Sequence, residues 1–272
     1  MTLPAEPRLR LAAQAAVSCL LEERIDTFPV DPAAMIARRG WQLRTFSHAA
    51  RRYSEDATAE VVSGLFGTRD AVTSVSMDHG KPTRYLICYN DLVDVPERVT
   101  FSLAHEIGHI LLGHFICGEE ELFTPAQRHV LDQEASAFAS NLLAPAPVVA
   151  LLRHPDREDM RQLFGLSKSG WQTRMETLTR DRLLLADSAD ALCRQFAGYM
   201  YRRQCTVCGA VFTDKPICPG CGSRALKWHP GRIADFPWTQ DAWRTAARPD
   251  PLMLENPLAD DARWHGDDRG IY

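Results

Sequence analysis

The sequence has neither an apolar run long enough to cross a membrane nor a strong excess of charge. Its 272 residues are 45% hydrophobic, but no stretch approaches the run of about eighteen apolar residues that marks a transmembrane helix. The 31 basic and 35 acidic residues give a formal net charge of -4. This balance argues against nucleic-acid binding by the molecule as a whole, although local patches remain open. We therefore expect a folded cytoplasmic protein.

The N-terminal segment also lacks the pattern of a signal peptide. Residues 1–26 have apolar residues at helical spacing, interrupted by charges at 22–24 and without a long apolar stretch before a cleavage site, so we expect a helix. The eight cysteines lack the distribution of a secreted disulfide framework: four are scattered, and four form Cys-x-x-Cys pairs at 205–208 and 218–221. Without an export signal, such pairs indicate metal binding in a reducing compartment.

Hydrophobic periodicity predicts an α+β fold with short strands. We expect helices where apolar residues recur at helical spacing, over 8–24, 31–39, 99–112, 126–143 and, in two parts, 156–180. We expect strands where β-branched and aromatic residues cluster, over 41–47, 71–77 and 84–90. Residues 50–63 fit either a loop or a short helix. Asp94 is expected to cap the helix at 99–112, with Pro96 in its first turn.

A His-Glu-x-x-His pattern lies within the apolar helix expected at 99–112. His105 and His109 are four residues apart, so on a helix both imidazoles lie on one face and can reach one metal ion. Glu106 lies about 100° around the helix from His105, where it suits a base acting on metal-bound water better than a ligand. A chance match on a surface helix is the alternative, but the apolar flanks would then bury three polar side chains without partners.

A catalytic zinc site needs three protein ligands and an open position for water. Glu134, on the helix expected at 126–143, is predicted to supply the third ligand if that helix packs antiparallel to the first. The apolar residues near Glu134 on the same side of the helix would then face the core. His114 is expected to face elsewhere and not to ligate, because it follows His109 by five residues.

Three separated motifs occur in the order found in the ImmA/IrrE peptidases. They are RYLICYN (84–90), ERVTFSLAHEIGHILLGH (97–114) and QEASAFASNLLAP (133–145), preceded by helices with a PVDP step at 29–32. The sequence resembles this family over about residues 10–180. Ala144 stands where the family often has methionine, which affects packing and not chemistry.

The resemblance implies a compact zincin-like domain with a short sheet beside the active-site helix. It implies zinc ligands at His105, His109 and Glu134, with Glu106 as the general base. Members of the family cleave a repressor, often one encoded beside them, and so derepress phage, mobile-element or damage-response genes. A helix-turn-helix repressor is therefore the expected substrate. We expect it to bind in extended form along 84–90, which we predict to be an edge strand.

The two cysteine pairs predict a second, structural zinc ion. Cys205 and Cys208 are separated from Cys218 and Cys221 by nine residues, and a glycine follows each pair, which resembles a zinc ribbon. Four thiolates form a closed tetrahedral site without room for substrate. The alternative is a set of redox-active or disulfide-bonded pairs.

The ribbon region at 193–232 is locally basic. It has seven basic side chains against one acidic one, interleaved with aromatic residues. This combination suits single-stranded DNA, through phosphate contacts and base stacking; a stabilising domain and a protein-docking surface are the alternatives. The tail at 233–272 has eight acidic and four basic residues, and its charge suits covering this patch.

A helix-turn-helix spacing occurs at 160–178, with Gly165 near the turn and Ser167 capping the second helix. Such a unit binds DNA in many proteins. Packing is favoured here, because the charge over 151–182 is only +2.

Cys88 and Asn90 point to one side of the strand expected at 84–90. If that side faces the metal, a Cys88 thiolate would occupy the open coordination position and inhibit the enzyme. The alternative is a small core residue, which is the usual role of an isolated cysteine on an apolar strand.

Four parts of the chain are expected: a zincin-like metallopeptidase domain at 1–148, a helix-turn-helix-like segment at 149–192, the ribbon at 193–232 and the acidic tail at 233–272.

The sequence predicts a zinc endopeptidase that cleaves a cognate repressor, with single-stranded DNA as a candidate activator. Among the repressor-cleaving peptidases, the ribbon favours one subset for this chain: the peptidases of repressor–protease pairs that control anti-phage operons such as CBASS. The rivals are a DNA-binding regulator with a zincin scaffold, against which the intact Glu106 argues, and a housekeeping protease.

Overall fold

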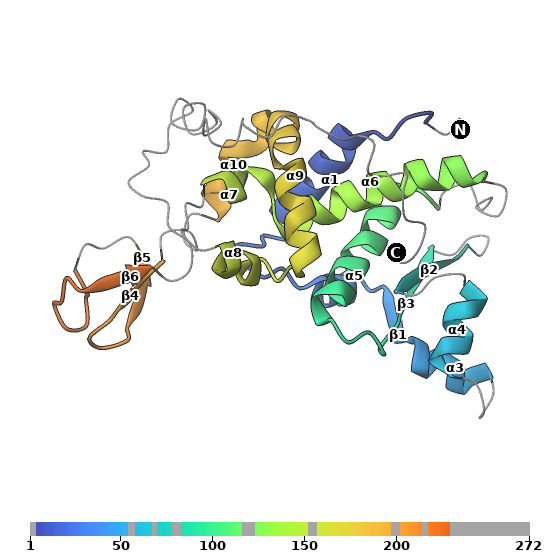
Figure 1. Ribbon diagram of the computed structural model, residues 1–272, viewed down its shortest axis with the longest axis horizontal. Helices are drawn as coiled ribbons and strands as arrows, with labels where there is room; N and C mark the ends of the chain where they lie inside the picture. The colour runs from blue at the N-terminus through green and yellow to red at the C-terminus, as the bar shows by residue number, and fades with distance from the viewer. Residues whose placement is uncertain are drawn as a thin grey trace.

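The fold is α+β, with a helical body beside a small sheet and a separate three-stranded unit near the C-terminal end (Figure 1). The computed structural model describes residues 4–53, 58–66, 70–77, 83–115, 123–151, 157–196, 202–213 and 217–228. Among these ranges, no helix has the length and apolar character needed to cross a membrane. The acidic tail predicted at 233–272 lies outside the described residues.

The predicted strands and most predicted helices are confirmed. The helices are α1 (Leu9–Glu22), α2 (Pro32–Arg38), α3 (Phe46–Tyr53), α4 (Ala59–Phe66), α5 (Pro96–Leu111), α6 (Pro125–Leu143), α7 (Ala146–Leu151), α8 (Arg157–Leu163), α9 (Lys168–Leu184) and α10 (Ala189–Gln195), with a 3-10 turn, η2 (Ala186–Ser188). The strands are β1 (Gln42–Thr45), β2 (Ala71–Ser76), β3 (Arg84–Tyr89), β4 (Arg202–Cys205), β5 (Val211–Thr213) and β6 (Leu226–Trp228). Most of the undecided segment at 50–63 is helical, in α3 and α4.

The first sheet has the order β1-β3-β2, with β1 parallel and β2 antiparallel to β3. The strand at 84–90 was expected at an edge, but β3 is central because it pairs on both sides. The edge strand beside α5 is β2, whose Thr73 side chain contacts this helix. Helices α3 and α4 pack on the other side of the sheet, around a small cluster that includes Phe46 and Cys88.

The main core joins α1, α5 and α6 in one layer of packed helices (Figure 1). Gly108 lies at the crossing of α5 and α6, where a Cβ atom would meet Phe138 Cδ1 at 3.0 Å and the Cα of Ala135 at 3.2 Å. The missing side chain therefore permits the close approach of the two helices. This approach sets the distance between the histidines of α5 and the side chains of α6.

The helices that follow α6 belong to the same core. Val148, Phe164 and Leu192 are buried in one cluster with residues of α1 and α5. The domain boundary predicted at residue 148 therefore falls inside a continuous hydrophobic core. The two helices predicted within 156–180 are α8 and α9, and Ser167 caps α9 by accepting a hydrogen bond from a main-chain N–H.

The two helices of the site begin differently. Asp94 was expected to cap α5, but Val95 is the capping residue and its side chain makes no cap hydrogen bond. Thr124 and Gln127 form a complete capping box at the start of α6. Because such a box satisfies main-chain N–H groups at the first turn, it fixes where α6 begins.

Candidate metal centres

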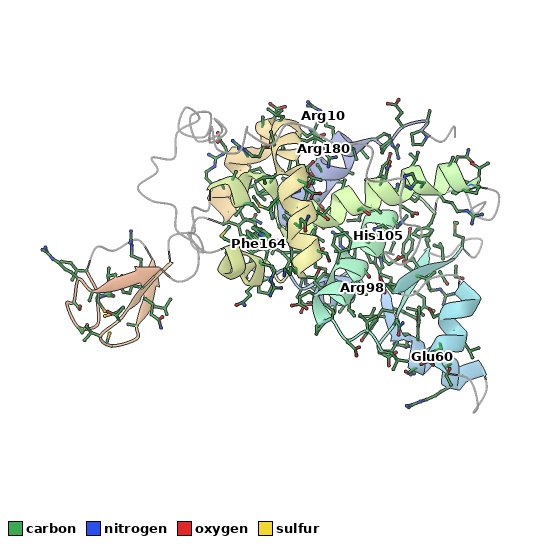
Figure 2. The ribbon with its side chains drawn as sticks, viewed as in Figure 1. Arg10, Glu60, Arg98, His105, Phe164 and Arg180 are labelled. Carbon is green, nitrogen blue, oxygen red and sulfur yellow. The ribbon has the colours of Figure 1, made fainter. Side chains whose placement is uncertain are left out.

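Helix α5 brings His105 and His109 together on one face, as the four-residue spacing predicts. Their Nε2 atoms lie 2.9 Å apart. His105 lies where α5 and α6 pack against each other (Figure 2). Two metal-ligand nitrogens thus point toward one position beside α6.

Asp132 of α6 completes this group. Its Oδ1 lies 3.4 Å from His109 Nε2, and the donor atoms of His105, His109 and Asp132 all lie within 4.8 Å of one another. The Asp132 side chain is 49% exposed, whereas that of His109 is 13% exposed. The group therefore opens to solvent on the carboxylate side, which is what a catalytic site with a free coordination position requires.

Glu134 was predicted as the third ligand, and the structure places it elsewhere. Its side chain is fully buried. Oε1 accepts hydrogen bonds from the main-chain N–H of Arg8 at 2.7 Å and from Nε of the same residue at 2.9 Å. Oε2 accepts from Arg8 Nη2 at 2.8 Å and lies 3.1 Å from His114 Nε2.

The difference follows from the rotation of α6. Residues two apart on a helix lie on nearly opposite sides, whereas residues four apart share a face. Glu134 shares its side with the buried Phe138, while Asp132 shares the metal-facing side with Ser136. The proteolytic interpretation needed a carboxylate from this helix, and Asp132 provides one two residues earlier. In the sequence, the four-residue spacing of Asp132 and Ser136 was the pattern that could have indicated a polar face of this helix toward the histidines.

Glu106 follows His105 on α5 and is not a member of the metal-binding group. It is 8% exposed, and its Oε2 accepts a 2.6 Å hydrogen bond from the Thr73 hydroxyl of β2. Burial raises the pKa of Glu106, although the neighbouring His109 and the Thr73 hydrogen bond oppose that rise. Thr73 has no local sequence signal, because it lies thirty-three residues away in the chain.

The hydrogen-bond partners of the two Nδ1 atoms determine whether the Nε2 atoms of His105 and His109 carry a proton or a free lone pair. His114 Nδ1 lies 2.9 Å from His109 Nδ1, and Ser136 Oγ lies 3.2 Å from His105 Nδ1. When both Nδ1 atoms carry the proton and donate outward, both Nε2 atoms present lone pairs to each other and to the Asp132 carboxylate. Such a set repels itself unless a cation lies between its members.

Zinc fits this set in ligand type and spacing. Two ligands about 2.0–2.1 Å from a tetrahedral zinc ion lie about 3.3–3.4 Å apart. The distance between His109 and Asp132 is 3.4 Å, while the Nε2 atoms of His105 and His109, at 2.9 Å, are a few tenths of an ångström closer than this spacing. Burial lowers the pKa of His105, and its neighbours His109 and His114 lower it further. Burial also lowers the pKa of His114 to about 4. At neutral pH these two rings are therefore uncharged, the state in which an imidazole binds a metal.

Cys88 lies on the opposite face of the sheet from the histidines. It packs with Phe46, Ala50 and Val62 in the cluster beneath α3 and α4, whereas its neighbour Ile87 belongs to the core that contains α5. The side of β3 that carries Cys88 thus does not face the metal-binding group. In this arrangement Cys88 cannot occupy a coordination position there, and it is a small core residue.

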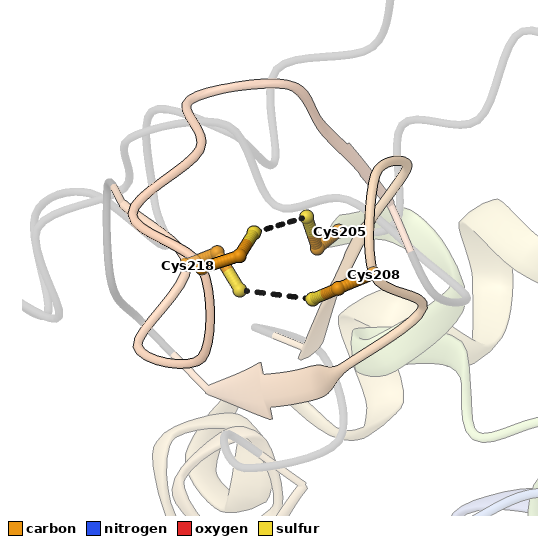
Figure 3. A group of neighbouring side chains, drawn as sticks. Cys205, Cys208 and Cys218 are labelled. Atoms are coloured by element: carbon orange, nitrogen blue, oxygen red, sulfur yellow. Dashed lines mark hydrogen bonds between the residues drawn. The ribbon is translucent and has the colours of Figure 1, made fainter.

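The four cysteines of the ribbon converge on one point (Figure 3). The Sγ atoms of Cys205 and Cys221, and those of Cys208 and Cys218, are each 3.5 Å apart. A disulfide bond is about 2.0 Å long, so these are separate thiols with the spacing of metal ligands. The main-chain N–H groups of Cys208 and Val207 lower the pKa of Cys205 to about 6. The predicted zinc-ribbon cluster is thus present.

Three strands in the order β5-β4-β6 carry the cysteine cluster. Arg203 and Gln204 of the central strand pair with residues of both neighbours. Val207 next to the first cysteine pair is 68% exposed, and Ile217 next to the second is 40% exposed. The ribbon thus carries apolar as well as basic side chains at its surface. Two of the aromatic residues of the basic region, Tyr199 and Tyr201, lie outside the described residues.

Comparison with known protein families finds a match within the larger of the two units. Residues 65–175 match the model of the IrrE N-terminal-like domain, in the family Peptidase_M78. The matched range runs from the end of α4 through the edge strand, both helices of the metal-binding group and the first half of α9. A search of the curated proteins finds no significant match.

Proposed function

Because the chain contains an IrrE N-terminal-like metallopeptidase domain at residues 65–175, we propose that it is a zinc endopeptidase whose catalytic ligands are His105, His109 and Asp132. The observation that carries this proposal is the convergence of two imidazoles and one carboxylate next to the buried carboxylate of Glu106. A chance His-Glu-x-x-His match would bring neither a third ligand nor a base to the same place.

The chain's own residues supply the proton transfers of peptide hydrolysis. A zinc ion held by this donor set supplies Lewis acidity and lowers the pKa of water. Glu106 accepts a proton from the attacking water and delivers it to the leaving amine. Thr73 binds Glu106 through its hydroxyl, which donates to Oε2, and through its main-chain N–H, and these bonds hold the carboxylate in place for the proton transfers. The buried position raises the pKa of Glu106, which favours holding the proton between the two transfers.

The substrate is proposed to bind in extended form along β2. This strand is at the edge of its sheet, and its one described partner is the central strand β3. An edge strand offers main-chain donors and acceptors to an added peptide strand. Because β2 also carries Thr73, a peptide paired with it would run past Glu106 and bring a scissile bond to the metal-binding group.

The proposed substrate is a helix-turn-helix transcriptional repressor whose cleavage derepresses stress, phage-defence or mobile-element genes. The resemblance to the ImmA/IrrE peptidases supports this choice. The test is incubation of the purified protein with the product of an adjacent gene that encodes such a repressor, followed by mass spectrometry of the fragments. A single defined cut supports a dedicated repressor peptidase, whereas many cuts in unrelated unfolded proteins support a housekeeping role.

Single-stranded DNA is proposed to activate the enzyme through the basic ribbon. The region at 193–232 has seven basic side chains and one acidic one, and phosphate contacts weaken strongly with salt. Cleavage should therefore be faster with single-stranded DNA, and the gain should shrink between about 50 and 200 mM salt. An Arg203→Gln, Arg224→Gln variant is the matched test, because it leaves the four cysteines intact.

A DNA-binding regulator with a catalytically idle zincin fold is the second candidate. It is favoured by the α8–α9 unit, in which Lys168 and Gln172 are exposed at the start of the second helix. The Glu106→Gln variant separates the candidates. A peptidase loses repressor cleavage and keeps its zinc, whereas a scaffold keeps its regulatory effect in full.

A further inference from the structure

A chain of polar groups, with the buried His114 and Glu134 at its middle, connects the metal-binding group to the start of α1. His109 Nδ1 lies 2.9 Å from His114 Nδ1, and His114 Nε2 lies 3.1 Å from Glu134 Oε2. Glu134 in turn accepts three hydrogen bonds from Arg8, which precedes α1. His114 is 6% exposed and Glu134 is fully buried. These contacts join the end of α5, helix α6 and the residue before α1 through one continuous path.

With His114 neutral, one direction of hydrogen bonding satisfies every member of this path. The Glu134 carboxylate accepts throughout, so His114 must donate to it from Nε2–H. A neutral His114 then has a lone pair on Nδ1, which accepts the proton that His109 carries on its own Nδ1. The remaining nitrogen of His109, Nε2, is thereby left unprotonated and directed at Asp132 and His105.

We propose that Arg8, Glu134 and His114 form a positioning relay that fixes the ring orientation and tautomer of the metal ligand His109. The inference rests on the proposed zinc peptidase function and adds three residues to its site. None of the three touches the reacting atoms. They act through His109, and they make the entry into α1 a structural part of the metal centre.

The relay differs from an ordinary buried ion pair. Arg8 alone would satisfy Glu134, since its guanidinium binds both carboxylate oxygens. The added bond to His114, and from there to His109, is what couples the pair to the metal-binding group. A ligating histidine commonly donates its second ring N–H to such an outer partner, and loss of the partner lowers metal affinity about 10–100-fold.

The test compares two substitutions at His114 in the full-length protein. His114→Leu removes the acceptor for His109, whereas His114→Gln keeps a side-chain oxygen that can accept the same proton. Zinc affinity is measured by competition with a chromophoric chelator. A His105→Ala variant, titrated in parallel, reports the ribbon site alone. The melting temperature of each variant in excess chelator separates lost packing from lost affinity.

The expected result is a loss of about 10–100-fold in zinc affinity at the peptidase site of His114→Leu, with His114→Gln within a few-fold of the parent. Parent-like affinity in His114→Leu, or equal losses in both variants, would overturn the relay. If His114→Leu does not fold, Glu134→Gln takes its place, and parent-like affinity there has the same meaning. A parent that binds zinc only at the ribbon would instead overturn the proposed function, and the relay with it.

Discussion

Asp132 and Glu134 lie two residues apart on α6, and their carboxylates bind different partners. Asp132 lies 3.4 Å from His109 Nε2, while Glu134 binds Arg8 and His114. The bond from Arg8 and the contact with His114 keep the pKa of Glu134 below its usual value in spite of its burial, which acts in the opposite direction. The hydrogen bond with His109 likewise keeps the pKa of Asp132 below its usual value, against the effect of burial. Both acids are therefore ionised at neutral pH, but only Asp132 is directed at the metal-binding group.

Substitution of these two acids should therefore give different metal contents. Asp132→Ala removes a ligand and should lose the peptidase-site zinc, so that elemental analysis finds one ion per chain in place of two. Glu134→Gln should still hold two ions at saturating zinc, with weakened affinity at one site. The reverse pattern, in which Asp132→Ala keeps both ions and Glu134→Gln keeps one, would identify Glu134 as the ligand.

Glu106→Gln should abolish cleavage without loss of metal. The amide cannot accept the proton of the attacking water, and the loss of a general base typically costs about 10²–10⁴-fold in rate. Zinc content should stay at the parental value, because Glu106 lies outside the ligand group. Cleavage of the substrate at the parental rate would show that another group acts as the base.

Thr73→Val should lower kcat more than it changes KM. Valine has the same shape as threonine but lacks the hydroxyl that donates to Glu106. A hydrogen bond to a charged group contributes about 1.5–3 kcal/mol, which corresponds to roughly a tenfold or greater change in rate. Thr73→Ser keeps the donor and should retain most of the activity. If both variants fail equally, Thr73 matters for packing against α5 and not for the orientation of Glu106.

Local patterns were sufficient to predict the first three strands, most of the longer helices and two of the three proposed ligands. The strands at β1, β2 and β3, the limits of α6 and the face shared by His105 and His109 follow from periodicity and spacing, which are properties of short segments. The same applies to the cysteine pairs, because the ribbon builds its site from residues close in sequence.

Apart from the cap of α5, which is Val95 and not Asp94, the errors concern how elements are placed relative to one another. The rotation of α6 decides whether Asp132 or Glu134 faces the histidines, and that rotation depends on the packing of its apolar side against α1 and α5. The central position of β3 in its sheet depends on its parallel pairing with β1. The residues around Cys88 contain no local pattern that predicts this pairing. Thr73 and Arg8 reach the site from distant segments, so their roles appear only in the folded chain.

Cys19 makes stability sensitive to alkaline pH. Burial raises its pKa to about 11 from the usual 9, although Arg39 lowers it. In the unfolded chain the thiol ionises from about pH 9, so the stabilisation from a buried neutral thiol is present below pH 9 and is lost as pH rises toward 11. Between pH 8 and 10.5 the parent should lose about 1–2 kcal/mol more than Cys19→Ala, measured by urea unfolding. Parallel pH profiles would show that Cys19 has an ordinary pKa in the folded protein.

The buried pair of Arg174 and Asp181 should be the most sensitive point of the helical body. Arg174 Nη1 donates to Asp181 Oδ2 at 2.6 Å, and both side chains are 1% exposed. Asp181→Ala leaves a buried guanidinium without its counter-ion, which typically costs about 3–5 kcal/mol. Arg180→Ala is the matched control, because Arg180 binds the same carboxylate from a 45% exposed position and should cost at most about 1 kcal/mol.

An Arg174→Met, Asp181→Leu double variant tests whether the cost comes from the unpaired charge. Apolar replacement of both partners removes the desolvated charges together, so the double variant should be more stable than Asp181→Ala. The free energy of unfolding in urea gives the comparison. If the double variant is instead less stable than Asp181→Ala, the unpaired charge is not the cause of the loss. The stability would then depend on other contacts, first of all the hydrogen bonds that both residues make with the buried Asn141 of α6.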